Sequence, residues 1–167
     1  FVYVSFVIDC HSRAIVGWQA ATVKTTPLVT TALRMGLWRR ERAGHPAADG
    51  LVHHSDAGSQ FTSVSFAETL ALEGIAASIG SIGDAYDNAL AESTIGLFKN
   101  EAIRDGSPFR TGPLRTIDDV EWVTTGWVDW YNSRRLHSTI GNVPPDEFEA
   151  TYYADHETPS HPVLAPA

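Results

Sequence analysis

The chain has little cysteine, little positive charge and no long apolar run. Its single cysteine, Cys10, excludes a disulfide bond within the chain. No apolar run approaches the roughly 20 residues that cross a bilayer, and no signal-peptide pattern stands at the start. We therefore expect a cytoplasmic protein that has no membrane partner.

Basic residues are outnumbered by acidic ones. Twelve Lys and Arg stand against 20 Asp and Glu, which gives a formal net charge of −8. Domains that bind nucleic acid are usually basic, so this chain repels DNA at long range. DNA binding would need a local basic cluster or a part of the protein outside this sequence.

The bulk composition is that of a soluble globular domain. The 167 residues are 43% hydrophobic and 19% charged, enough for one domain with a real core. Phe1 lies inside a strand-like run and is not Met, so we expect that processing or truncation has removed an upstream segment.

Strand and helix patterns alternate along the chain. Strands are predicted at 1–8, 14–21, 51–54 and 75–78, and helices at about 27–42, 65–73, 87–104, 117–134 and 145–153. This order predicts an α/β domain with a mixed sheet flanked by helices. We assign residues 1–154 to this domain and expect 155–167, which is rich in proline, to be a disordered tail.

Local signals add detail to three helices. The first is expected to pack through a stripe of Leu28, Thr31/Ala32, Met35 and Trp38. Either Ser63 or Ser65 is predicted to cap the second. Asp87 or Asn88 is predicted to cap the third, after a flexible loop that reaches Tyr86.

Two carboxylates are candidates for metal chemistry. Asp56 follows a short buried strand, Glu92 lies in a helix, and 35 residues separate them. Carboxylates from separate elements can hold Mg²⁺ or Mn²⁺, and two such ions can promote attack on a phosphodiester. The alternative that these two carboxylates have no shared chemical role is also open, because 20 acidic residues produce many such pairs. Lys99 lies seven residues after Glu92 on the same helical face. Its side chain either binds phosphate or simply faces solvent.

The other polar candidates each have two interpretations. Gln60 either orients water or DNA or satisfies amides of its own loop, and Asn88 either contacts the site or caps its helix. Arg134, Arg135 and His137 form a phosphate-binding cluster or a basic helix end that complements the helix dipole. His53 and His54 are interpreted as structural.

Six segments in order carry a family resemblance: Phe1–Trp18, His54–Phe61 (HSDAGSQF), Gly74–Ser78, Asp87–Glu101 (DNALAESTIGLFKNE), Tyr131–His137 (YNSRRLH) and Pro145–Glu149. Together they resemble the catalytic core of DDE-type (rve-like) integrases, specifically the transposases of bacterial insertion sequences. The resemblance runs from Phe1 to about Tyr153.

The resemblance implies a ribonuclease H-like fold and a metal-dependent transferase that cuts and joins DNA ends in the bacterial cytoplasm. Asp56 and Glu92 match the second and third acidic residues, which hold Mg²⁺ or Mn²⁺, and Lys99 matches the lysine directed at the DNA end. Gln60, Asn88, Arg134 and Arg135 are the further DNA-binding candidates. Element ends and target DNA are the expected partners, and a homo-oligomer the expected assembly.

One part of the pattern has no match. The family's first strand, which carries its first Asp, would lie upstream of Phe1, and Asp9 aligns instead with a residue that closes the second strand. We interpret Asp9 as a turn residue. A two-metal site is therefore expected only in the complete protein, and impaired activity in this chain. A ribonuclease H-like nuclease and a non-catalytic DNA-docking or dimerisation fragment are the alternatives.

Overall fold

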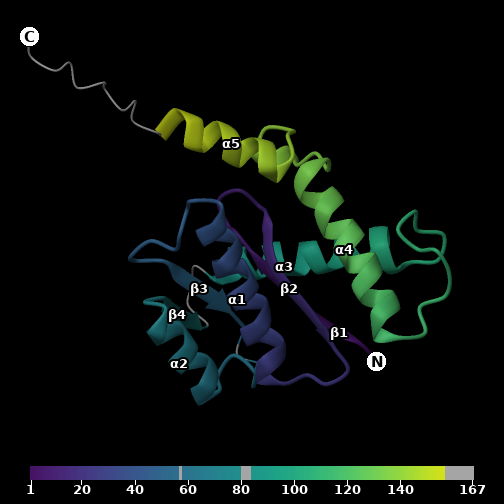
Figure 1. Ribbon diagram of the computed structural model, residues 1–167, viewed down its shortest axis with the longest axis horizontal. Helices are drawn as coiled ribbons and strands as arrows, with labels where there is room; N and C mark the ends of the chain where they lie inside the picture. The colour runs from purple at the N-terminus through teal and green to yellow at the C-terminus, as the bar shows by residue number, and fades with distance from the viewer. Residues whose placement is uncertain (57, 80–83, 157–167) are drawn as a thin grey trace, which may run out of the picture.

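The computed structural model describes residues 1–56, 58–79 and 84–156 (Figure 1). Most of the predicted tail at 155–167 lies outside these residues. The elements alternate between strands and helices as the sequence predicts. None of the helices in the described ranges is long and apolar enough to cross a membrane.

A β-hairpin opens the chain. Strands β1 (Tyr3–Ile8) and β2 (Ile15–Ala21) pair antiparallel, with an irregularity at Val7/Ile8. The Asp9 carboxylate closes the turn, because its Oδ1 accepts from the backbone N–H of His11 (2.8 Å) and of Ser12 (3.0 Å). The interpretation of Asp9 as a turn residue is confirmed.

A second pair of strands lies beside the hairpin. Strands β3 (Val52–Ser55) and β4 (Ala76–Ile79) pair in parallel, and helix α2 (Val64–Leu72) connects them. Ser63 is the N-cap, accepting from the backbone N–H of Phe66 at 3.2 Å, so Ser63 and not Ser65 caps this helix. In the described part of the chain the strands form two two-stranded sheets, one antiparallel and one parallel.

Helix α1 (Thr26–Arg42) crosses the hairpin at very close range. A Cβ built on Gly17 would overlap the Ala32 carbonyl, so only glycine allows this approach. The predicted stripe on α1 was partly wrong, since Trp38 is 56% exposed while Leu33 and Gly36 are buried. The face of α1 is set by small residues that let two backbones meet, not by the largest apolar side chains.

Helix α3 (Asp84–Phe98) runs behind the strands, opposite α1 (Figure 1). It begins three residues before the predicted cap at Asp87, so Asn88 lies inside the helix and the cap prediction was wrong. A π-helical turn, η1 (Lys99–Ile103), continues it directly.

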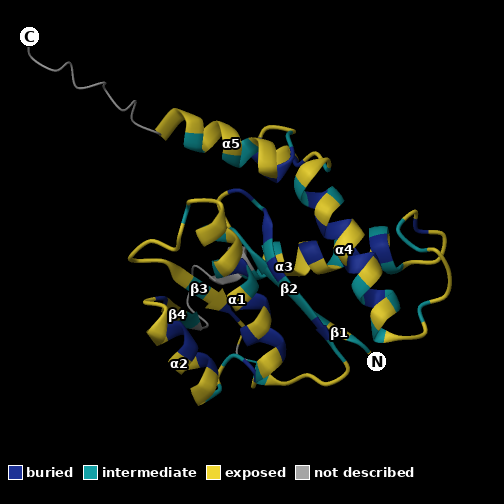
Figure 2. Ribbon diagram, in the orientation of Figure 1, coloured by how far each residue is buried: buried dark blue, intermediate teal, exposed yellow. Residues whose placement is uncertain are grey.

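Helix α4 (Ile117–Ser133) begins with a complete capping box between Thr116 and Asp119. Its Trp127 is fully buried against Phe98 and Phe6, in one of the two hydrophobic clusters that the described residues form in the core. Buried and exposed residues alternate along α4 (Figure 2). A short 3₁₀ turn, η2 (Ser138–Ile140), leads to helix α5 (Pro145–His156).

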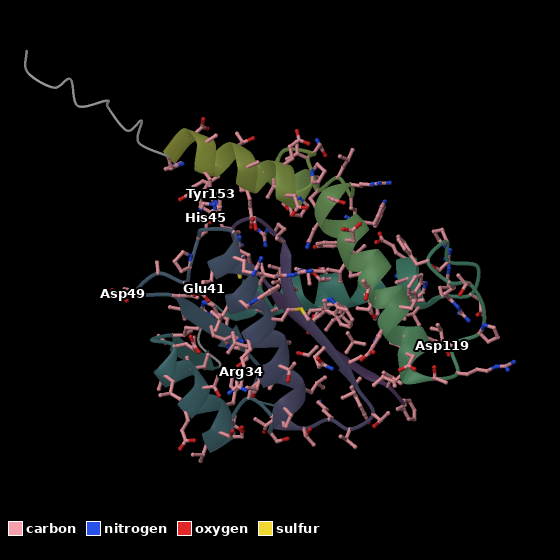
Figure 3. The ribbon with its side chains drawn as sticks, viewed as in Figure 1. Arg34, Glu41, His45, Asp49, Asp119 and Tyr153 are labelled. Atoms are coloured by element: carbon pink, nitrogen blue, oxygen red, sulfur yellow. The ribbon has the colours of Figure 1, made fainter. Side chains whose placement is uncertain are left out.

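Ionic contacts tie α5 to the rest of the domain. The Arg40 guanidinium bonds Asp9 at 2.7 Å and Glu149 at 2.6 Å, so one cation joins the hairpin turn, α1 and α5. His45 stacks on Tyr153 at a ring distance of 3.4 Å, as the side-chain view shows (Figure 3). Burial opposes ionisation of Asp9, but the N–H of Ser12 and the charge of Arg40 lower the pKa of this carboxyl below its usual value.

Candidate active site

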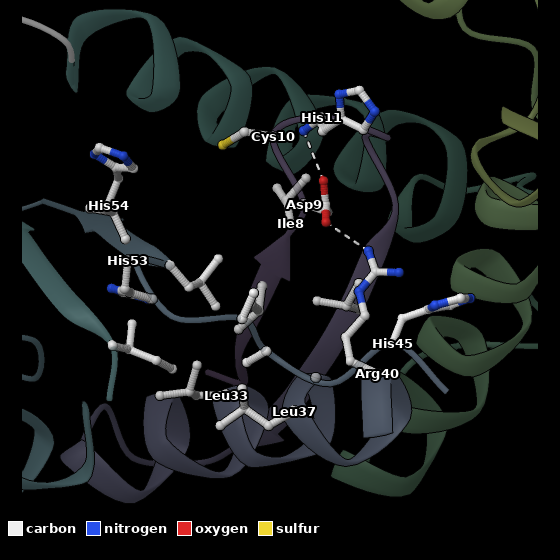
Figure 4. A pocket seen from close by; sticks show the side chains of 18 of the residues that line it. Ile8, Asp9, Cys10, His11, Leu33, Leu37, Arg40, His45, His53 and His54 are labelled. Atoms are coloured by element: carbon white, nitrogen blue, oxygen red, sulfur yellow. Dashed lines mark hydrogen bonds and ion pairs between the residues drawn. The ribbon is translucent and has the colours of Figure 1, made fainter. Parts of the chain in front are cut away.

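A cavity of about 550 Å³ lies between the two sheets (Figure 4). Residues of β1 line one side and residues of β3 the other, while α1 contributes Leu33 and Leu37 and α3 contributes Leu90 and Ala91. Each sheet has only two strands, so β1 and β3 each keep one unpaired edge in the described part of the chain. The cavity therefore has the boundaries of a slot for one more strand.

His53 is the one polar wall residue whose burial leaves an atom without a partner. Its Nδ1 is buried and forms no hydrogen bond within the described residues, while its ring packs edge-on against Phe66. Burial, with a smaller effect from His54, lowers the pKa of His53 below 6.5. The structural interpretation of His53 is therefore supported.

Asp56 lies immediately beyond the end of β3, on an exposed loop. Its Oδ1 accepts from the backbone N–H of Gly58 at 2.8 Å. Gln60, in the same loop, is only 7% exposed. Such burial favours a role for Gln60 within the loop over direct contact with DNA.

Glu92 lies on α3, the helix that contacts β3. It is exposed, and it directly follows the cavity residue Ala91. Asn88, one turn earlier, is half-buried. Asp56 thus follows a strand, β3, that contacts the helix of Glu92, and both carboxylates lie within two residues in sequence of a cavity residue, His54 or Ala91.

Lys99 is the first residue of the π-helical turn and is exposed. Arg104 N–H donates to the Lys99 carbonyl at 3.0 Å, a bond that spans five residues and closes the wider turn. Because α3 is regular up to Phe98, Glu92 and Lys99 keep the same helical face that the sequence predicts.

The predicted basic cluster is divided by the structure. Arg134 is exposed, but Arg135 binds both oxygens of Glu101, and His137 is 7% exposed with its ring edge-on to Tyr131. Burial lowers the pKa of His137, which makes a phosphate-binding imidazolium unfavourable. Glu101 could not be predicted as the partner of Arg135, because no local pattern links positions 34 apart.

Comparison with known proteins gives the family. Residues 1–85 match the Integrase core domain family, and residues 73–145 match a second family of the same description. The chain belongs to the integrase core domain family.

Sequence relatives of this integrase core come from bacterial insertion sequences. It is 46% identical over 160 residues to a Mycobacterium tuberculosis protein named as a transposase for insertion sequence element IS986/IS6110, covering 96% of this chain and 56% of that protein. It is 44% identical over 154 residues to the transposase for IS629 of Shigella sonnei, covering 92% and 48%. The chain spans about half the length of these relatives.

Solved structures confirm the ribonuclease H-like fold. The catalytic core domain of BIV integrase superposes with a TM-score of 0.64 at 15% identity, over 93% of this chain and 91% of that one. The HTLV-2 integrase core domain, solved in complex with magnesium, superposes with a TM-score of 0.58 at 16% identity, over 89% and 91%.

Proposed function

We propose that this integrase core is the catalytic domain of a bacterial DNA transposase that cuts and joins DNA ends. The observation that carries the proposal is that Asp56 directly follows β3 and Glu92 lies on α3, the helix that contacts β3, in a chain of this family. The proposed reaction takes place in the bacterial cytoplasm.

The donor set fits a hard divalent cation. Asp56 and Glu92 offer exposed carboxylate oxygens, which Mg²⁺ and Mn²⁺ prefer. A cation held by them would supply charge neutralisation at the phosphorus under attack. Among the described residues no group of three acidic, His or Cys side chains is placed to hold a metal ion. The pair therefore needs a further ligand.

We propose that a strand from elsewhere in the longer protein fills the slot between β1 and β3 and carries that ligand. The unpaired edges of β1 and β3 would both bond to it, and the orphaned Nδ1 of His53 would gain a polar neighbour. Asp9 is unsuited to the role because its carboxylate already binds Arg40 and two backbone amides.

In the proposed reaction, water first attacks a phosphodiester at the element end and releases a 3′-hydroxyl. That hydroxyl then attacks a target phosphodiester, so one bond to phosphorus forms as another breaks and no bond to the protein is made. Asp56 and Glu92 would hold the divalent cation that neutralises the reacting phosphate, and Lys99 would bind the neighbouring phosphate. Homo-oligomers are the proposed assembly, in line with the trimeric HTLV-2 integrase core.

The test uses the full-length protein with labelled duplexes that carry the ends of its element. Asp56→Asn and Glu92→Gln should each lower strand joining by a factor of roughly 10³ or more, because each removes a charge that acts at the reacting phosphorus. Matched controls are Asp49→Asn and Glu41→Gln, two exposed carboxylates on other parts of the surface (Figure 3). These should leave joining unchanged.

The products separate the alternatives. Joined strands support the transposase, and cleavage without joining indicates a nuclease on the same fold. If Asp56→Asn and Glu92→Gln keep full joining activity, or leave Mn²⁺ binding unchanged, the carboxylate site is not the catalytic centre. A non-catalytic docking module would bind the end duplex and yield neither product.

A further inference from the structure

Glu101 accepts four hydrogen bonds, all from the side chains of Arg135 and Trp127. It lies in η1, two residues after Lys99. One oxygen accepts from Arg135 Nε (3.0 Å) and Nη2 (2.9 Å), and the other accepts from Arg135 Nε (3.2 Å) and Trp127 Nε1 (3.0 Å). A planar guanidinium fork on a carboxylate fixes direction as well as distance.

The donors to Glu101 are themselves held rigidly. Trp127 is fully buried in the core. The guanidinium of Arg135 lies over the Tyr131 ring, 5.9 Å from its centroid, and Tyr131 is 2% exposed and shares a hydrogen bond with Thr94 of α3. We call Glu101, Arg135 and Trp127 the η1 clamp. It joins the YNSRRLH segment to the turn that carries Lys99.

The turn itself explains why a clamp is needed. A π-helical turn is less stable than an α-helical one and usually marks a functional site. Its closing bond, from Arg104 N–H to the Lys99 carbonyl, fixes the backbone of Lys99 but not the tilt of the turn. Contacts from Glu101 to a buried tryptophan and a stacked arginine supply that second constraint.

The clamp also keeps Glu101 apart from Lys99. Residues two apart do not share a helical face, and Arg135 engages both oxygens of Glu101. Lys99 is exposed, and the described part of the chain shows no ion pair of Lys99. The clamp thus holds one side of η1, while Lys99 stays exposed about two turns after Glu92 on the same helical face.

We propose that Glu101 and Arg135 are positioning residues that direct Lys99 onto the DNA phosphate. This inference rests on the proposed function, and it assigns Arg135 to Lys99 rather than to DNA itself. The inference predicts that loss of the clamp slows strand joining only through Lys99. In a variant that lacks Lys99, loss of the clamp should therefore have no further effect on strand joining.

The test is a double-mutant cycle in the full-length protein. Strand joining is measured in single turnover at saturating end duplex, and duplex affinity is measured separately. Glu101→Gln keeps the shape of the side chain but loses the charge that orients Arg135, and should slow joining about tenfold, within the coupling range of contacting residues. In a Lys99→Ala background the same change should cost less than about twofold.

Two further variants keep the result unambiguous. Arg135→Lys keeps the positive charge but loses the forked guanidinium, so it should reproduce most of the joining defect of Glu101→Gln. This variant replaces Glu101→Gln in the test if Glu101→Gln folds poorly. Asp105→Asn breaks the nearby Asp105–Arg110 pair, whose aspartate side chain is 96% exposed, and should leave joining unchanged. Thermal midpoints are recorded for every variant.

The outcomes separate the two proposals. The positioning role is overturned, while the proposed function stands, in two cases. In the first, Glu101→Gln joins strands at the wild-type rate. In the second, Glu101→Gln slows joining by the same factor in the Lys99→Ala background as in the wild type. A defect that follows the thermal midpoint alone also overturns it, since the clamp is then only structural. A wild-type protein that joins no ends overturns both.

Discussion

At the scale of single residues, the environment of each ionisable group decides what it can do. Asp9 and Glu101 are both acidic residues in motifs of the family resemblance, yet each is bound by an arginine and by further N–H donors. Asp56 and Glu92 remain exposed. The carboxylates available for a cation are thus those that the fold leaves without a guanidinium partner.

His53 makes a prediction at this scale. Burial lowers its pKa, so the folded protein favours neutral imidazole while the unfolded chain binds a proton near pH 6.5. Below pH 6.5 the unfolded state therefore binds more protons, and stability should fall as the pH falls towards the lowered pKa. The slope from this one group is at most about 1.4 kcal/mol per pH unit.

Chemical denaturation of the full-length protein between pH 7.5 and 5 measures this slope. His53→Leu should reduce the slope, while His156→Leu, at an exposed histidine of α5, should not. An unchanged slope in His53→Leu would show that His53 is equally protonated in the folded and unfolded states.

At the scale of elements, close backbone contact orders the first half of the domain. Gly17 of β2 meets α1 where an added methyl group would overlap the backbone of Ala32 and Gly36. Gly17→Ala should therefore destabilise the protein by about 1–3 kcal/mol, because neither backbone can give way without disturbing the core.

A glycine in α4 provides the matched control. At Gly126 a new Cβ would meet only Phe109 at an ordinary 3.7 Å, so Gly126→Ala should stabilise the helix by about 0.5–1 kcal/mol. Urea unfolding of both variants measures the two effects. Equal and small changes would mean that α1 can move away from β2.

Periodicity and end signals predict the elements well, because they are local properties of the chain. The first two strands, a serine cap on α2 and the order of helices follow from them. The buried face of α1 does not, since it depends on which backbone α1 meets. The Arg135–Glu101 pair also escapes prediction, because the two residues lie 34 positions apart in sequence. Local pattern makes Asp56 and Glu92 one candidate pair among many, and only the family resemblance selects them.

At the scale of the whole molecule, the two sheets are held beside each other by helices rather than by strand pairing. Helix α1 packs on the hairpin, α3 packs on β3, and α2 bridges β3 to β4 and α1. Between β1 and β3 lies the cavity, with apolar side chains on both helical faces. In the described part of the chain, one edge of β1 and one edge of β3 are thus unpaired, a liability that the proposed strand between them would remove.

Hydrogen exchange in the full-length protein tests the slot directly. Amides of β1 alternate between those that bond β2 and those that point into the cavity. If a strand fills the slot, both sets should exchange at comparably slow rates, and the cavity-facing amides of β3 should be protected as well. Exposed loop amides between Gly44 and Gly50 give the fast reference. Cavity-facing amides that exchange as fast as this loop would show that the edges of β1 and β3 remain unpaired, and the missing metal ligand would then have to come from another element.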